Sequence, residues 1–293
     1  MDVICVISKK IIFTASFSCR MIDERRKMNK SKKEEQLEKE ILKGLTEKPL
    51  QIAEYLFNDQ ETHALQEYAN VVSIKRLGYN DHGPVHMRKT VLNSIQMANL
   101  LNKAGVRFNL EKEMGYSYSD SLSAIIMAAL FHDIGMGVSR NDHEFHGAVL
   151  ASPIITRTLA HFFNDPLIKA VLHSLVLEGI TGHMAAHPVH SLEAGVILVG
   201  DGCDMEHGRA RITTMLSKKP KIGDIHRYSA TAINRVEICA GKELPIRISV
   251  EMESTTGFFQ VEEVLYPKIN NSPVKKFIEL YAGKTGEAPL RYL

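Results

Sequence analysis

The chain of 293 residues has few cysteines, no long apolar run and almost no net charge. The four cysteines (Cys5, Cys19, Cys203 and Cys239) lie far apart and form no CxxC pair, which disfavours a disulfide framework and excludes a thiolate zinc ribbon. No uncharged apolar stretch approaches the roughly 18 residues that a membrane helix needs. The formal net charge of +2 is too small for a polybasic membrane binder or a nucleic-acid coat. We therefore expect a cytoplasmic protein without a membrane segment.

The sequence also lacks the short motifs of several enzyme classes. It contains no GxxxxGK[ST] loop and no GxGxxG turn after a strand, which argues against nucleotide binding through a P-loop or a Rossmann fold. The HExxH motif of zinc proteases and the GxSxG motif of serine hydrolases are absent as well. Any catalytic function must therefore rest on another constellation of residues.

Residues 1–48 are predicted to be a leader and a charged, peripheral helix. The apolar run Ile11–Cys19 is only nine residues long and follows Lys9 and Lys10, so its likeness to a signal sequence is faint. Two interpretations of residues 1–27 stay open, a disordered leader and a start codon placed upstream of Met28.

Residues 50–217 are predicted to form an all-helical domain. Apolar residues recur there at helical spacing, and no strand-like alternation interrupts them. Turn and capping residues divide the region into helices. The expected helices begin at Asn80-Asp81, at Asp120 (ending at Gly135–Gly137), at Asp142 (ending near Phe163), at Asp165-Pro166 (ending at Gly179) and at His187-Pro188 (ending near Met205).

Residues 224–293 are predicted to form a small α+β module after a polar linker over 218–224. Ile246, Ile248, Val250 and Met252 alternate with polar residues, which is typical of a strand with one solvated face. Residues 259–269 have helical spacing, and residues 277–282 are a further candidate strand. The predicted fold class is therefore mainly α, an all-helical bundle followed by a small α+β C-terminal module.

Thirteen histidines stand out in this composition, and most lie between His63 and His207. Several occupy otherwise apolar positions on successive predicted helices; His82 and His86, four residues apart on one helix, would share a face. Burying imidazole and carboxylate groups without partners costs several kcal/mol each, and a shared metal ion relieves that cost. Helical bundles hold metals in this way. Seven residues are the candidate ligands: His82, His86, His132, Asp133, His146, His173 and Asp201.

The order His86, His132-Asp133, Asp201 resembles the H…HD…D signature of the HD-domain metal-dependent phosphohydrolase superfamily. The resemblance covers roughly residues 60–210 and includes the flanking sequences NDHG at 80–83, FHDIG at 131–135 and VGDGCDM at 199–205. It implies an HD-type bundle that binds a divalent metal through His86, His132, Asp133 and Asp201, with Asp133 and His132 as the catalytic pair. In binuclear members the aspartate of the HD pair bridges two ions. By position, His146, His173 and His82 match the additional ligands.

The sequence departs from this family in its phosphate contact. Members often carry a lysine where this chain has Met136, so the resemblance implies that another cation meets the phosphate, and Arg140, Arg209 and Arg211 are candidates. His143 is expected to be an exposed residue of a first helical turn, and His183 part of a polar loop. The HHE and Gly-Tyr-Pro elements of cyclic-di-GMP phosphodiesterases are absent.

The main functional hypothesis is metal-dependent hydrolysis of a phosphomonoester or phosphodiester of a small, nucleotide-like substrate. Ligation by imidazole and oxygen suits one or two ions of Mn, Fe, Co, Ni, Zn or Mg. A second hypothesis is a non-catalytic sensor or assembly protein that binds metal and nucleotide, and a distant third is a di-iron oxygenase. DNA or RNA as a partner is not indicated by the near-neutral body of the chain, and a homo-oligomer is compatible with the sequence.

Overall fold

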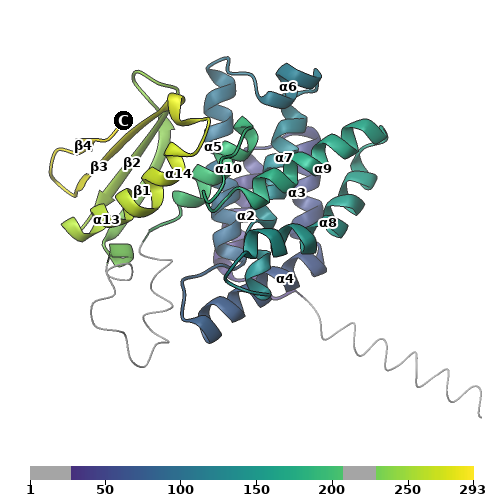
Figure 1. Cartoon of the computed structure of the whole chain (residues 1–293), viewed down its shortest axis with the longest axis horizontal. Coiled ribbons are helices and arrows are strands. Elements are labelled where there is room, and N and C mark those ends of the chain that lie inside the picture. Colours follow the sequence, from purple (N-terminus) through teal and green to yellow (C-terminus); the bar gives the residue numbers. More distant parts are fainter. Residues whose placement is uncertain (1–27, 207–228) are drawn as a thin grey trace, which may run out of the picture. The chain divides into compact units, whose positions relative to one another are not determined.

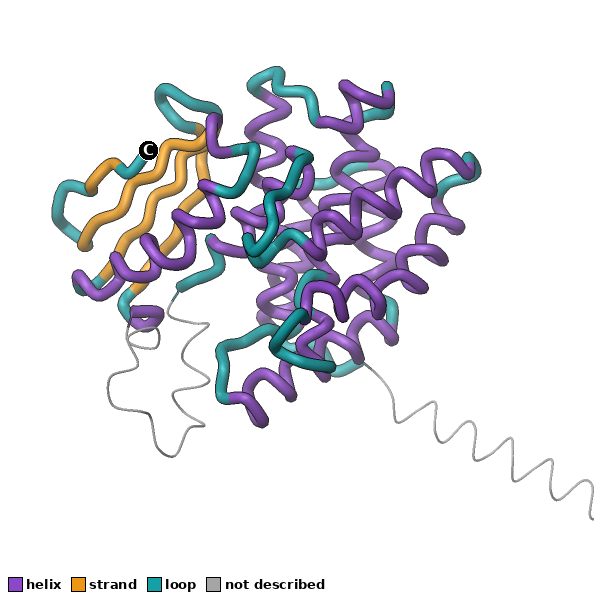
Figure 2. The backbone as a smooth tube through the Cα atoms, in the orientation of Figure 1, coloured by secondary structure: helices purple, strands orange, loops and turns teal. Residues whose placement is uncertain are grey.

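The computed structural model describes residues 28–206 and 229–293. Residues Lys33–Leu293 form one compact unit. Within it, helices account for the chain up to residue 202, and a single four-stranded sheet lies in the C-terminal part (Figures 1 and 2). The predicted fold class, a helical bundle followed by a small α+β module, is confirmed.

The bundle is built around α7 (Tyr118–Phe131). Every residue of this helix from Asp120 to Phe131 is buried, because α3, α5, α9 and α10 all contact it. A helix that is apolar on all sides is stable only at such a central position. The other helices are α2 (Lys32–Lys43), α3 (Glu47–Phe57), α4 (Gln60–Val71) with the π-helical η1 (Val72–Leu77), α5 (Pro84–Lys103), α6 (Asn109–Met114), the 3₁₀ turn η2 (Ile134–Gly137), α8 (His143–Phe162), α9 (Pro166–Thr181) and α10 (Leu192–Gly202).

Two helices begin later than the sequence predicts. Helix α5 begins at Pro84 instead of Asn80, because Asp81 Oδ1 accepts a hydrogen bond from Gly83 N (2.8 Å) and holds a turn ahead of the helix. Helix α10 begins after Ser191 instead of at His187, because the Ser191 hydroxyl accepts from Ala194 N (3.0 Å) as an N-cap. His82 therefore lies in a loop and not on the helix that carries His86.

The charged helix α2 is part of the core. Its Leu37 and Ile41 are buried in the same hydrophobic cluster as α7. Its polar side also contacts the bundle. Glu38 Oε1 accepts a hydrogen bond from Arg88 Nη2 (2.7 Å), and Glu34 Oε1 lies 3.3 Å from His63 Nε2. The charge pattern of this segment predicts a peripheral helix, but the apolar stripe is enough to bury one face.

The C-terminal sheet has the order β1-β2-β3-β4. β2 pairs antiparallel with β1 and parallel with β3, so the chain crosses over between β2 and β3 through a helical segment, and β4 pairs antiparallel with β3. The predicted alternation on β2 is confirmed by the burial of Ile246, Ile248, Val250 and Met252. The strands are β1 (Ile233–Ala240), β2 (Ile246–Met252), β3 (Ile278–Lys284) and β4 (Leu290–Arg291); the helical segments are η3 (Thr255–Gly257), α13 (Phe258–Gln260), η4 (Val261–Leu265), α14 (Tyr266–Asn270) and η5 (Lys275–Phe277).

The sheet module is joined to the bundle by direct contacts. Helix α14 contacts α10, and strand β1 contacts α5. The polar linker predicted over 218–224 lies outside the described residues. In the part of the chain that the structure describes, no helix combines the length and hydrophobicity that crossing a bilayer requires.

A buried carboxylate joins α10 to the start of α6 and leads to a prediction on pH. Glu193, only 1% exposed, accepts hydrogen bonds from Leu110 N (3.0 Å) and Ser121 Oγ (2.9 Å), yet burial raises its pKa above the ordinary 4.5. Glu193 therefore binds a proton more readily in the folded state than in the unfolded state. Its contribution to the free energy of unfolding falls as pH rises above the ordinary pKa of 4.5. We expect the unfolding free energy of wild type minus that of Glu193→Gln, measured with urea, to decrease with rising pH. A difference that stays constant with pH would contradict this.

Candidate metal centre

Seven histidine and aspartate residues at or near helix ends converge on one buried cluster. Helix ends allow this because the backbone there can turn and direct neighbouring residues to one point. His86 lies in the first turn of α5, with His82 in the loop before it; His132 and Asp133 connect α7 to η2; His143 is the first residue of α8; His183 follows α9; and Asp201 is in the last turn of α10.

One oxygen of Asp133 faces the first group of ligands. Asp133 Oδ2 lies 3.1 Å from His82 Nδ1, 3.2 Å from His86 Nε2 and 3.3 Å from His132 Nε2. Asp201 completes this group, since its Oδ1 lies 3.1 Å from His86 Nε2 and 3.8 Å from His132 Nε2. Three imidazoles and two carboxylates therefore surround one point.

The other oxygen of Asp133 faces a second group. Asp133 Oδ1 lies 3.3 Å from His143 Nε2 and 3.4 Å from His183 Nε2, and these two nitrogens are 3.1 Å apart. His143 and His183 are each 1% exposed. The carboxylate of Asp133 thus stands between two sets of nitrogen ligands, as a bridging ligand of two ions would.

The hydrogen bonds of four imidazoles determine which ring nitrogen carries the proton. In each ring Nδ1 faces an acceptor that cannot donate, so Nδ1 is the N–H donor and the Nε2 lone pair points into the cluster. The acceptors are Asp204 Oδ2 for His86 (2.7 Å), Ala129 O for His132 (2.9 Å), Arg140 O for His143 (3.0 Å) and Ile180 O for His183 (2.7 Å).

This arrangement of protons fits a metal. His86 Nε2 and His132 Nε2 are 3.1 Å apart, so two neutral rings would present lone pairs to each other. A cation between the nitrogens removes that repulsion, and metal-ligating histidines commonly donate their other N–H to a carboxylate or carbonyl, as here. The residues present therefore fit a divalent ion on each side of Asp133, bound by nitrogen and carboxylate oxygen.

The pKa shifts in the cluster follow from burial and from its two aspartates. Burial opposes a charge on His143, but the hydrogen bond with Asp133 and its charge raise the pKa of that ring above the ordinary 6.5. Burial lowers the pKa of His183 to about 4, so its ring is neutral near pH 7. Burial alone would raise the pKa of Asp133, but the neighbouring histidines, His132 foremost, hold it well below its ordinary value. Burial also opposes ionisation of Asp201, but the Lys268 ammonium leads the interactions that hold its pKa well below the ordinary range. The carboxylates are charged and able to bind a cation.

The structure brings together five of the seven predicted ligands and leaves out two. His82, His86, His132, Asp133 and Asp201 are in the cluster. In the described ranges, no group of potential ligand atoms includes His146 or His173. His173 Nε2 instead lies 3.1 Å from Ser152 Oγ, and His146 is partly exposed on α8.

His143 and His183 occupy the places predicted for His146 and His173. His143 precedes His146 by about one helical turn, so helical periodicity alone does not separate them. Gly135 separates them, because it lets η2 approach the first turn of α8 so closely that a Cβ there would lie 1.9 Å from His143 O. His183 lies in a loop, where no periodicity exists to detect it. The expectation of an exposed His143 was wrong; His183 lies in a loop as expected, but it is buried in the cluster.

The candidate phosphate-binding cations are placed differently from one another. Arg140 lies beside the cluster. Its backbone carbonyl is hydrogen-bonded to His143 Nδ1 (3.0 Å), and its guanidinium lies 5.5 Å from the ring centroid of Tyr79. Arg209 and Arg211 lie outside the described residues. Sequence reasoning missed Lys268, whose ammonium forms an ion pair with Asp201.

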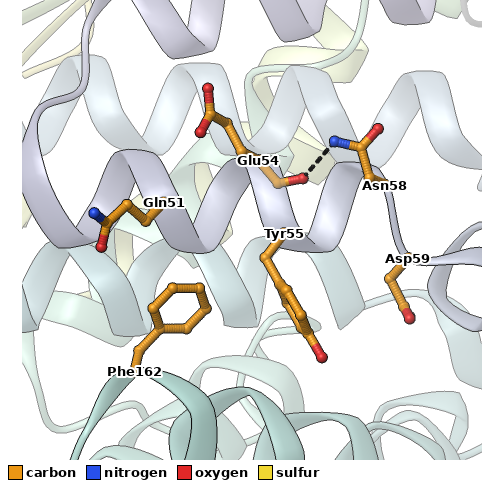
Figure 3. A pocket seen from close by; sticks show the side chains of 6 residues that line it. All are labelled: Gln51, Glu54, Tyr55, Asn58, Asp59 and Phe162. Carbon is orange, nitrogen blue, oxygen red and sulfur yellow. Dashed lines mark hydrogen bonds between the residues drawn. The ribbon is translucent and has the colours of Figure 1, made fainter.

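Two other features lie outside this centre. Glu34, His63 and Glu67 form a further group of potential ligands beside α2, where Arg88 already supplies a positive charge. A surface pocket between α3 and the end of α8 is shown in Figure 3, and none of its lining residues belongs to the cluster. Two of the lining residues are joined by a hydrogen bond from Asn58 Nδ2 to the Glu54 carbonyl (2.8 Å). Neither feature competes with the cluster as the main site.

Comparisons with known proteins agree with the geometry. The family model described as "HD domain" matches residues 90–206, which include His132, Asp133 and Asp201. The chain is 36% identical over 257 residues to uncharacterized protein MJ1020 of Methanocaldococcus jannaschii, an alignment that covers 86% of this chain and 95% of that protein. No solved structure matches the chain. With its H…HD…D residues gathered at one buried point, the chain belongs to the HD-domain metal-dependent phosphohydrolase superfamily.

Proposed function

We propose that this protein hydrolyses a phosphomonoester or phosphodiester of a small, nucleotide-like substrate, with Asp133 and His132 at the catalytic centre. The observation that carries the proposal is the position of Asp133, whose two carboxylate oxygens face separate groups of inward-pointing imidazoles. Two bound divalent ions would supply activation of water near neutral pH and stabilisation of charge on a phosphoryl group.

The exposed tyrosines beside η2 and Arg140 favour a substrate with a flat ring and a negative charge. Tyr68 and Tyr79 are each 46% exposed, and the guanidinium groups of Arg76 and Arg140 lie over their rings at 5.3 and 5.5 Å. Tyr68 adjoins η2, because a Cβ on Gly137 would come within 3.0 Å of its ring. Aromatic faces stack on nucleobases, and arginine meets phosphate. These contacts support a nucleotide-like substrate class.

The experiment that tests the centre is metal analysis of anaerobically purified protein with four histidine variants. We expect about two ions per chain in wild type and about one in His143→Ala and in His183→Ala, because each removes a nitrogen ligand beside Asp133 Oδ1. His146→Ala and His173→Ala are the matched controls and should retain the wild-type metal content. Equal losses in all four variants would contradict the assignment of ligands.

Turnover separates the proposal from its alternatives. The expected result is hydrolysis that depends on added Mn²⁺, Fe²⁺, Co²⁺, Ni²⁺, Zn²⁺ or Mg²⁺. Nucleotide monoesters would release inorganic phosphate, and diesters would yield a monoester and an alcohol. Tight nucleotide binding without product under every metal would instead favour a sensor or assembly protein. Oxygen consumption that depends on Fe²⁺ would favour oxygenase chemistry.

A further inference from the structure

The C-terminal module contributes a side chain to the metal centre. Lys268, on α14, forms an ion pair with Asp201 through its Nζ and also donates to the backbone carbonyl of His183 (2.9 Å). The lysine side chain is only 12% exposed. One ammonium group therefore contacts residues from both halves of the cluster, although it lies 67 positions from Asp201 in the sequence.

The position of Lys268 is set by close packing on α10. A Cβ on Gly202 would lie 3.1 Å from Lys268 Cδ, so the lysine stem passes directly over a residue that has no side chain. Just beyond α14, the Ser272 hydroxyl donates to Gly195 O (3.1 Å) and is itself buried. The module is thus anchored on the helix that carries Asp201, and the ammonium is held in place before any ligand arrives.

The chemistry of this ammonium suits an anionic group at the centre. A lysine ammonium has three N–H donors, and Asp201 and His183 O account for two of them. Of the lysine and arginine side chains in the described ranges, Lys268 is the one that ion-pairs with a cluster carboxylate. Met136, three residues after Asp133, is fully buried and apolar, so it offers no positive charge there. Arg140 lies against Tyr79, so it is placed to meet another part of the substrate than Lys268 does.

We propose that Lys268 binds the phosphoryl group of the substrate, so that the C-terminal module completes the active site instead of being an appended domain. This inference rests on the proposed function, because it assigns a residue to the phosphate of that reaction. The third N–H would donate to a phosphoryl oxygen, while the other two keep the ammonium over Asp201. A competing role, in which Lys268 merely orients Asp201, predicts a different experimental result.

The test measures binding of inorganic phosphate to the metal-loaded full chain by calorimetry. A hydrogen bond to a charged group contributes about 1.5–3 kcal/mol, so Lys268→Met should weaken phosphate binding about 10- to 100-fold. Metal affinity without phosphate should stay equal or increase, because a positive charge beside the ions is removed. Lys275→Met, the same substitution at an exposed lysine of the module, is the matched control and should change neither.

Lys268→Gln is a second variant that separates loss of the charge from loss of folding or displacement of Asp201. The amide keeps an N–H donor for Asp201 but carries no charge, so phosphate binding should still weaken, and Lys268→Arg should restore part of it. Unchanged phosphate affinity in the folded variants would overturn the inference, as would a 10- to 100-fold loss of metal affinity, the effect of disturbing a group that orients a ligand. Because the test needs no turnover, a wild type that binds phosphate through Lys268 but releases no product would refute the proposed reaction alone.

Discussion

Replacing Asp133 by alanine should remove both metal ions and abolish turnover. Both oxygens of this carboxylate face ligand nitrogens, three on the Oδ2 side and two on the Oδ1 side, so one substitution disrupts both halves of the centre. Removing a single group that stabilises charge at an active site typically costs 10²–10³ in rate, so a loss of about 10³-fold or more is expected here. Elemental analysis and a phosphate-release assay measure the two effects.

Two variants define what the Asp133 result means. Asp133→Asn keeps the shape of the side chain but removes its charge, so retained metal in this variant would show that the charge is dispensable. Asp165→Ala removes an exposed aspartate that caps α9; it should cost about 1 kcal/mol of stability and leave metal content unchanged. Full metal content and turnover in Asp133→Ala would refute both the assignment of the centre and the proposed function.

Replacing Gly135 by alanine should have the largest effect on folding. A Cβ there would lie 1.9 Å from His143 O and 2.4 Å from Gly147 N, and both are backbone atoms that no change of rotamer can move. Relieving the overlap requires η2 and α8 to separate, which we expect to cost at least about 3 kcal/mol. The melting temperature should fall by about 10 °C, and metal affinity should fall with it, because Asp133 and His143 lie on the two separated segments.

Gly44→Ala is the matched control for this substitution. The nearest atom to a Cβ at Gly44 is Ile41 O at 3.6 Å, an ordinary contact, so this variant should melt within a few degrees of wild type. Thermal unfolding by circular dichroism, with and without added metal, measures both variants. If the Gly135→Ala protein unfolds at the same temperature as wild type, the close approach of η2 and α8 is not required for stability.

Part of the centre follows from local sequence. His132 and Asp133 are adjacent at the end of an apolar helix that is followed by glycine, and Asp201 ends another apolar helix, so both sites can be found by helical periodicity. Periodicity indicates which face of a helix is buried. It does not show where along the helix axis that face meets another element, so it does not distinguish His143 from His146, one helical turn away. The alternation in β2 is equally local and was predicted correctly.

The sequence by itself predicted the helical bundle and the small α+β module, because both depend on spacing within single elements. The candidate ligands His86, His132, Asp133 and Asp201 followed from the resemblance to the H…HD…D signature. Only the tertiary structure decided the rest. His183 reaches the cluster from a loop, and Lys268 reaches Asp201 from a helix of the sheet module. Their positions result from how α9, α10 and α14 pack on one another, and contacts between residues far apart in the chain leave no periodic signal in a single sequence.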